Sequence, residues 1–232
     1  MRHFILIFIL LFSIRTFGHT CDPQKVTCPI CGKKVEFCVT MSMTTFGTYY
    51  DFQKKGAVGC HYEELINSCQ YCHYSGYISD FDTIYSKERK DEIRSYLKQF
   101  ALVNIDDVNE CKIAGDLANF MHKSNNKIAN YYLIGSYLAR FDSIRNELRV
   151  SLQLETSDYL EKAIQNNEYK DSSSVATIYY LIAEMNRRAS QYDKAIEYYD
   201  KAINDPNKMD WVEEVATKQK EIAINKDNNN KI

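Results

Sequence analysis

Two short cysteine motifs constrain this chain more than any other feature of its sequence. One pair is Cys28 and Cys31, and the other, with the same two-residue gap, is Cys69 and Cys72. This gap lets both thiolates of one turn point at a single metal ion, and Gly32 suits the tight backbone that such a turn needs. Two turns together supply four sulfur atoms in a tetrahedron. The sequence therefore predicts a closed structural zinc site made by these cysteines.

Two other uses of the cysteines stay open. All eight follow an apolar leader, and an even number of cysteines in an oxidising compartment is typical of a disulfide framework. Alternatively, Cys28 and Cys31 are similar to the dithiol of thioredoxin-like proteins and would exchange disulfides. That chemistry needs the dithiol at the start of a helix, whereas Gly32, two lysines and an alternating strand follow here. Zinc binding is therefore the favoured prediction.

The remaining cysteines are candidates for a disulfide. Cys38 and Cys60 lie outside the paired motifs but within the same segment, which makes them the first choice for a bridge. A link between Cys21 and Cys111 is a longer alternative. The histidines that directly follow Cys60 and Cys72 are alternative ligands, although a histidine beside a ligand more often supports the site from outside.

Residues 1–20 have the composition of an export signal. Arg2 and His3 form a short polar start, residues 4–14 are apolar, and residues suited to a signal peptidase follow at positions 16, 18 and 20. The apolar run is too short to span a bilayer comfortably. We expect a cleaved signal peptide and a secreted or periplasmic protein. An uncleaved anchor and lipid attachment at Cys21 are disfavoured, the latter because FGHT lacks the small residue expected before that cysteine.

The pattern of residues 21–82 predicts a small zinc-ribbon-like β module. This segment holds seven of the eight cysteines. Its KKVEFCVT stretch alternates apolar and polar residues as a half-buried strand does. A second β-favouring run, TTFGTYYDF, covers residues 44–52, and QKKGAVG at residues 53–59 predicts a turn or loop.

From residue 83 onward the pattern is helical, so the expected fold is mainly α. We expect connecting helices in residues 83–124, an antiparallel helical array in residues 125–224 and a disordered tail in residues 225–232. The stretch SIRNELRVSL is expected to be an insertion between two helices of the array.

One stretch of the array has the pattern of a tetratricopeptide repeat, a helix–turn–helix unit of about 34 residues. It covers residues 176–206, and its key positions are Tyr179, Ile182, Ala183, Ala195, Tyr199 and Ala202. A weaker unit precedes it, and an ordinary antiparallel helical pair is the alternative for both. Stacked repeats offer a concave face to a peptide or protein partner. The candidates for that face are Tyr132, Tyr180 and Asn186.

The composition of the chain and the absence of common catalytic motifs restrict the classes of function that we expect. The chain carries 29 basic and 31 acidic residues, so no basic field is available to neutralise phosphates and no nucleic-acid partner is expected. The motifs of phosphate-binding loops, dinucleotide folds, zinc proteases and α/β-hydrolases are absent from the sequence. We expect an exported, non-catalytic protein-binding scaffold with structural zinc. The alternatives are an exported thiol–disulfide exchange protein and a disulfide-stapled structural envelope protein.

The cysteine motifs and their surroundings also resemble a known bacterial family. CPICGKKVEF, TYYDF and CQYCHYSGYISDF are similar to sequences of the family called domain of unknown function 2225, and the likeness covers residues 28–81 well. The resemblance implies metal ligation by the four paired cysteines and a helical, tetratricopeptide-like C-terminal region. Gln70 and His73 stand where the family usually has proline and glycine.

Overall fold

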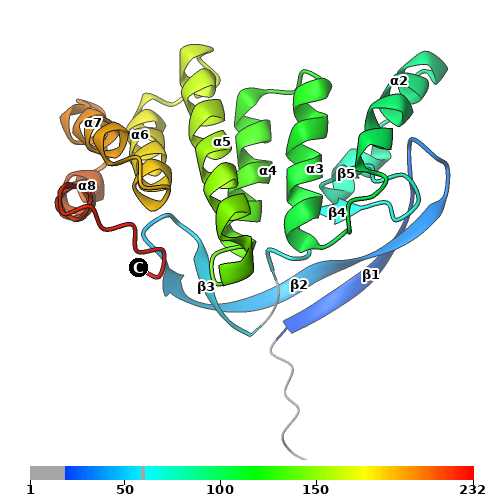
Figure 1. Cartoon of the computed structure of the whole chain (residues 1–232), viewed down its shortest axis with the longest axis horizontal. Coiled ribbons are helices and arrows are strands. Elements are labelled where there is room, and N and C mark those ends of the chain that lie inside the picture. The colour runs from blue at the N-terminus through cyan, green and yellow to red at the C-terminus, as the bar shows by residue number, and fades with distance from the viewer. Residues whose placement is uncertain (1–18, 59–60) are drawn as a thin grey trace, which may run out of the picture.

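A row of α-helices stands above a long, curved β-ribbon in the computed structural model of the chain (Figure 1), which describes residues 19–58 and 61–232. The prediction of a mainly α fold with a small β part near the N-terminus is confirmed. Residues 1–18 of the expected signal peptide lie outside the described residues, and so does Cys60, whereas its last two residues, His19 and Thr20, begin a strand.

The row of helices follows the order of the chain, because each helix from α3 to α8 packs against the next one. The helices are α2 (Lys87–Leu97), α3 (Asp107–Phe120), α4 (Asn125–Leu138), α5 (Asn146–Gln165), α6 (Ser172–Arg188), α7 (Tyr192–Asn204) and α8 (Asp210–Ile224). Side chains cap several of their first turns. Ser86 accepts a hydrogen bond from the backbone of Arg89, and Asp106 accepts two from the start of α3.

The strands form two antiparallel sheets within the described part of the chain. They are β1 (His19–Thr27), β2 (Lys34–Thr48), β3 (Lys54–Val58), β4 (Asn67–Ser68) and β5 (Ser75–Gly76), arranged as β1-β2-β3 and β4-β5. The ribbon of the first sheet runs beneath the row of helices, from the region of α2 towards α6 (Figure 1).

One prediction about the ribbon is wrong. Both β-favouring runs contribute to one strand, β2, which ends at Thr48, but the segment expected to be a turn contains β3. The chain reverses earlier, where the Tyr49 N–H donates to the Gln53 carbonyl and Phe52 adopts a φ of 70°. The turn therefore forms around Tyr50 and Asp51, and the lysines and glycine after it pair with β2.

The predicted insertion between two helices of the array is also wrong. The chain makes one short 3-10 turn, Ser143–Arg145, and then enters α5, which covers most of the SIRNELRVSL stretch. Asp142 caps that turn by accepting from the Ile144 N–H, and Leu152 is buried in the core. The polar residues that suggested a loop belong to the helix.

The three residues predicted to line a binding face lie in the core instead. Tyr132, Tyr180 and Asn186 are at most 3% exposed. The Tyr132 hydroxyl donates to Asp116 at 2.8 Å, and Asn186 Nδ2 donates to Ser157 Oγ at 2.7 Å. Buried tyrosine hydroxyls and side-chain amides usually find a hydrogen-bond partner inside the protein, and these residues do so.

The predicted disordered tail is ordered over residues 227–232. Its backbone oxygen atoms accept hydrogen bonds from arginine side chains of the helical array. Figure 1 shows this end of the chain running from α8 towards the turn between β2 and β3.

The cysteine-rich segment and the first helices share one hydrophobic core. Phe37 and Phe81 pack edge to face, with ring centroids 4.8 Å apart, in the same cluster as Ile93 and Leu117 of α2 and α3. The module is therefore anchored on helices as well as on its own strands. Among the residues described, no helix is long and apolar enough to cross a membrane.

Candidate metal centre

Two turns of the same design carry the four paired cysteines. The first joins β1 to β2, and the second joins β4 to β5. In each turn the N–H of the first cysteine donates to the carbonyl five residues later: Cys28 to Lys33 at 2.9 Å, and Cys69 to Tyr74 at 2.8 Å. This shared pattern closes both turns around the sulfur atoms.

The residue after the second cysteine completes each turn in the left-handed region of the backbone. Gly32 has a φ of 71° and His73 a φ of 61°. Their N–H groups donate back to the carbonyls of Cys28 and Cys69, at 2.9 and 2.8 Å. The sequence predicted this conformation for Gly32, whereas His73 adopts it despite its side chain.

The four sulfur atoms are spaced as a tetrahedral metal site requires. All of them lie within 4.8 Å of one another. The two closest pairs join different turns: Cys28 to Cys72 and Cys31 to Cys69, each at 3.6 Å. Zinc–sulfur bonds of 2.3 Å in a tetrahedron place the sulfurs about 3.8 Å apart. The residues present therefore fit a four-thiolate metal ion, and the prediction that these cysteines converge is confirmed.

The four thiols influence one another strongly. The neighbouring thiol of Cys28 is the main cause that lowers the pKa of Cys69, and Cys69 in turn raises the pKa of Cys28. Hydrogen bonds with Cys28 and Cys69 also raise the pKa of Cys72. One thiolate is thus stabilised by neighbours that keep their protons. A bound dication would instead stabilise all four thiolates.

The metal centre is partly shielded from solvent. Cys28 and Cys69 are buried, while Cys31 and Cys72 are partly exposed. Arg94 of α2 donates from Nη2 to the Ile30 carbonyl at 2.9 Å and so ties the helix to the first turn. Sequence reasoning missed Arg94, because only the folded chain brings it beside the cysteines.

The geometry around Cys28 and Cys31 differs from that of a thioredoxin-like dithiol. The two cysteines lie in a turn that leads into β2, so no helix begins at Cys31. A helix N-terminus is one of the features that lowers a catalytic thiol pKa in such proteins. The closest sulfur of each cysteine also belongs to the other turn.

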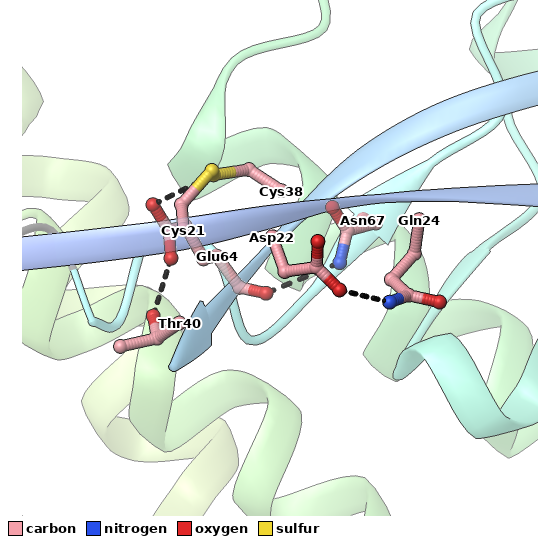
Figure 2. Close-up of a disulfide and its surroundings, with 7 residues drawn as sticks. All are labelled: Cys21, Asp22, Gln24, Cys38, Thr40, Glu64 and Asn67. Atoms are coloured by element: carbon pink, nitrogen blue, oxygen red, sulfur yellow. Dashed lines mark hydrogen bonds between the residues drawn. A yellow bond between two sulfur atoms is a disulfide. The ribbon is translucent and has the colours of Figure 1, made fainter. Parts of the chain in front are cut away.

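The disulfide of the described residues joins Cys38 to Cys21, so the predicted bridge from Cys38 to Cys60 is wrong (Figure 2). Cys21 lies opposite Thr40 in the antiparallel register, and Pro23 lies opposite Cys38. The two cysteines are therefore diagonal neighbours, with Cα atoms 5.5 Å apart, which suits a disulfide.

The alternative link between Cys21 and Cys111 is not formed either. Cys111 is a free thiol buried in α3, and burial raises the pKa of that thiol well above its ordinary value. Its burial among helices keeps it away from the ribbon that carries Cys21. This cysteine is part of the helical core.

Glu64 lies beside the disulfide without making it a metal site. Its Oε1 atom is 3.3 Å from Cys38 Sγ, and the Thr40 hydroxyl donates to its other oxygen (Figure 2). Sulfur atoms joined to each other no longer offer the two thiolates that a metal ion would need. Among the described residues, the four paired cysteines are therefore the cluster suited to a metal.

The comparison with family models matches the cysteine turns and the helices together. A family described as "Uncharacterized protein conserved in bacteria (DUF2225)" matches residues 23–223, which is most of the chain. No curated protein and no solved structure gives a significant match. The match covers the ribbon, the metal centre and the array through α8, so the chain belongs to the DUF2225 family of bacterial proteins.

Proposed function

We propose that the four paired cysteines hold a structural zinc ion in an exported, non-catalytic binding protein. The observation that carries this proposal is the tetrahedral spacing of four sulfur atoms from two matching turns. Four protein thiolates fill the coordination of zinc, so such a site has no position left for a substrate or an activated water. The ion would link two turns of the chain.

The position of the centre explains what this link would stabilise. It joins the end of β1 to the β4–β5 turn, which is a two-stranded sheet of two residues per strand. Strands this short are marginal by themselves. Metal binding adds free energy of folding where a small module has little core of its own.

The helical array supports a binding role. In α6 and α7, Ala183, Ala195 and Ala202 are fully buried, as the small residues at the crossing of a tetratricopeptide-like pair would be. A row of helices from α3 to α8 presents a long surface to a protein or peptide partner. We therefore assign partner binding to the array rather than to the metal centre.

Export is supported by two features of the N-terminal part. The leader has the pattern of a cleaved signal, and the Cys21–Cys38 bond is of a kind that persists in oxidising compartments. Together they favour a secreted or periplasmic protein.

The test is to measure zinc and free thiols on chain purified from an oxidising compartment without chelator. We expect about one zinc per chain, with the four paired cysteines reacting only after chelation and denaturation. Cys72→Ser should lose the zinc, and Cys111→Ala is the matched control that should keep it. A chain without zinc and without free thiols in these turns would instead have a disulfide framework, and Cys28 and Cys31 would then need an insulin-reduction assay.

A further inference from the structure

An unbalanced group of buried arginines lies where α4, α5 and α6 meet the C-terminal tail. This arginine cluster consists of Arg140, Arg149, Arg187 and Arg188, and each is at most 7% exposed. Its ion pairs are with Asp51 and Glu184. Four guanidinium groups thus share two side-chain carboxylates, and Arg188 also contacts the α-carboxylate of Ile232, so the cluster keeps a formal excess of one positive charge. Such an excess is costly unless other acceptors compensate it.

The tail segment, residues 227–232, supplies those acceptors from its backbone. Arg187 donates to the Asp227 carbonyl at 2.9 Å, and Arg188 donates to the Asn230 carbonyl at 2.9 Å and to an α-carboxylate oxygen of Ile232 at 2.7 Å. Arg140 also donates to the Asn230 carbonyl. The cluster therefore already binds an extended peptide, through carbonyl oxygens spread along it.

The tail segment compensates the arginines incompletely. Arg140 Nε is buried and has no hydrogen-bond partner. Arg149 bonds to the side chains of Gln153 and Asn146, which are uncharged. Burial lowers the pKa of Arg149, and the neighbouring charges of Arg140 and Arg188 lower it further. Neutral carbonyls are weaker partners for a guanidinium than carboxylates.

Asn230 is the residue of the tail segment at which an acidic side chain would lie closest to the arginine that lacks a carboxylate partner. Its carbonyl accepts from two arginines, and its Oδ1 atom accepts from Gln153 Nε2 at 2.9 Å. Gln153 in turn accepts from Arg149 at 3.0 Å. An acidic side chain at this position would face the part of the cluster that lacks a carboxylate.

A cavity of about 520 Å³ continues from the end of the tail segment. It is lined by Lys231 and Ile232 together with Phe52, Tyr180, Trp211 and Lys55. A lining that combines aromatic rings with lysines suits a peptide that carries both apolar and acidic side chains. Release of the tail would enlarge this cavity.

We propose that the arginine cluster is a binding site for an acidic peptide segment of a partner protein, and that residues 227–232 are its built-in occupant. The site recognises a peptide because its donors reach several backbone carbonyls along the segment, and an acidic one because one positive charge of the cluster has no carboxylate partner. This inference rests on the proposed binding role of the helical array and names the chemistry of the partner.

The test compares the full chain with a chain that ends at Lys226. Two fluorescein-labelled peptides are titrated by anisotropy: DNNNKI, the sequence of the tail, and the same peptide with Asn229→Asp and Asn230→Asp. We expect the shortened chain to bind the doubly substituted acidic peptide at least tenfold more tightly than DNNNKI. The full chain should bind both at least tenfold more weakly than the shortened chain does.

Two variants of the shortened chain sharpen the result. Arg149→Gln removes one positive charge without leaving a carboxylate unpaired, so it should reduce the preference for the acidic peptide. Arg89→Gln, on α2 at the other end of the row, should leave binding unchanged. A folded, zinc-loaded shortened chain that binds neither peptide, or binds both equally, would overturn the inference while leaving the structural zinc site intact.

If the shortened chain does not fold, a variant of the full chain tests whether the arginine cluster favours an acidic side chain. Asn230→Asp should raise the melting temperature of the full chain, because it places a carboxylate beside uncompensated arginines. An unchanged or lowered melting temperature would overturn the inference.

Discussion

Gly32 and His73 occupy equivalent positions in the two cysteine turns, with backbone φ angles of 71° and 61°. Glycine adopts this conformation freely, whereas a residue with a Cβ atom loses about 1–2 kcal/mol there. Both residues donate an N–H to the carbonyl of the first cysteine of their turn, so neither can leave the conformation without opening the turn. The two halves of the metal centre therefore differ in strain.

We predict that His73→Gly stabilises the zinc-loaded protein by about 1 kcal/mol, because it relieves backbone strain. The gain is measured as a higher urea midpoint at unchanged slope. His73→Ala is the matched control, since it removes the ring but keeps the Cβ atom. Equal stability of the glycine and alanine variants would show that the backbone carries no strain at this position.

The Cys21–Cys38 bond closes a short loop and should stabilise the chain through its unfolded state. The cysteines are 17 positions apart, and a loop of this size corresponds to about 3 kcal/mol. Cys21→Ser and Cys38→Ser should each lose about that much relative to the oxidised protein. Reduced wild type should match both variants. Peptide mapping under non-reducing conditions checks the pairing, and recovery of a Cys38–Cys60 peptide would contradict the structure.

Glu110 should make the protein less stable as the pH rises. Burial, followed by the charges of Asp107 and Asp106, raises the pKa of Glu110 to about 8 in the folded protein. An unfolded glutamate has a pKa of about 4.3. Between these values the folded chain keeps a proton that the unfolded chain releases, so the free energy of unfolding falls as the pH increases.

The variant Glu110→Gln removes this penalty. We expect it to be more stable than wild type by at least about 1 kcal/mol at pH 8, with a smaller difference at pH 5. Melting temperatures measured from pH 5 to pH 9 give the comparison, with exposed Glu88→Gln as the control. Parallel profiles for wild type and Glu110→Gln would refute the assignment.

The contact between α3 and α4 should not tolerate a larger residue at Gly115. A Cβ atom there would collide with the ring of Tyr132, which is buried and donates to Asp116. We predict that Gly115→Ala costs about 1–3 kcal/mol of stability, as overpacking usually does. The control is Gly47→Ala, where the space is open, so that any loss comes from the backbone conformation alone. If Gly115→Ala left the stability unchanged, the ring of Tyr132 could not lie where the structure has it.

The four-cysteine centre could be predicted from the sequence because its information is local. A gap of two residues and a glycine after Cys31 are sufficient to predict one turn, and the repeated gap at Cys69 predicts its partner. The mainly α fold was predictable for the same reason, because helical periodicity is a property of each segment alone.

The disulfide could not be predicted, because it depends on how two strands align. A shift of one residue would have placed Cys21 on the other face of the ribbon, away from Cys38. The pairing runs without a shift from Thr27 opposite Lys34 to Cys21 opposite Thr40, and the sequence pattern does not predict that residues 19–27 form a strand at all.

The order of the tail and the arginine cluster could not be predicted either. Arg188 and Ile232 are 44 positions apart, and Arg140 and Asn230 are 90 apart. Composition alone predicts that an asparagine-rich end stays disordered. The arginines come together only when the helices pack. Their acceptors lie on a segment that forms no helix or strand, so neither partner has a local sequence signal.

Strand β2 connects the two sites described above, the metal centre and the arginine cluster. It begins three residues after Cys31 and runs 15 residues without interruption, a contour of about 50 Å, to the turn that carries Asp51. Asp51 pairs with Arg140, and Tyr180 donates to the carbonyl of Tyr50. The metal centre and the arginine cluster are therefore joined by one continuous strand, whose pairing with β3 shifts register between Thr44 and Thr48. A displacement of one site relative to the other would have to bend this strand or shift its pairing.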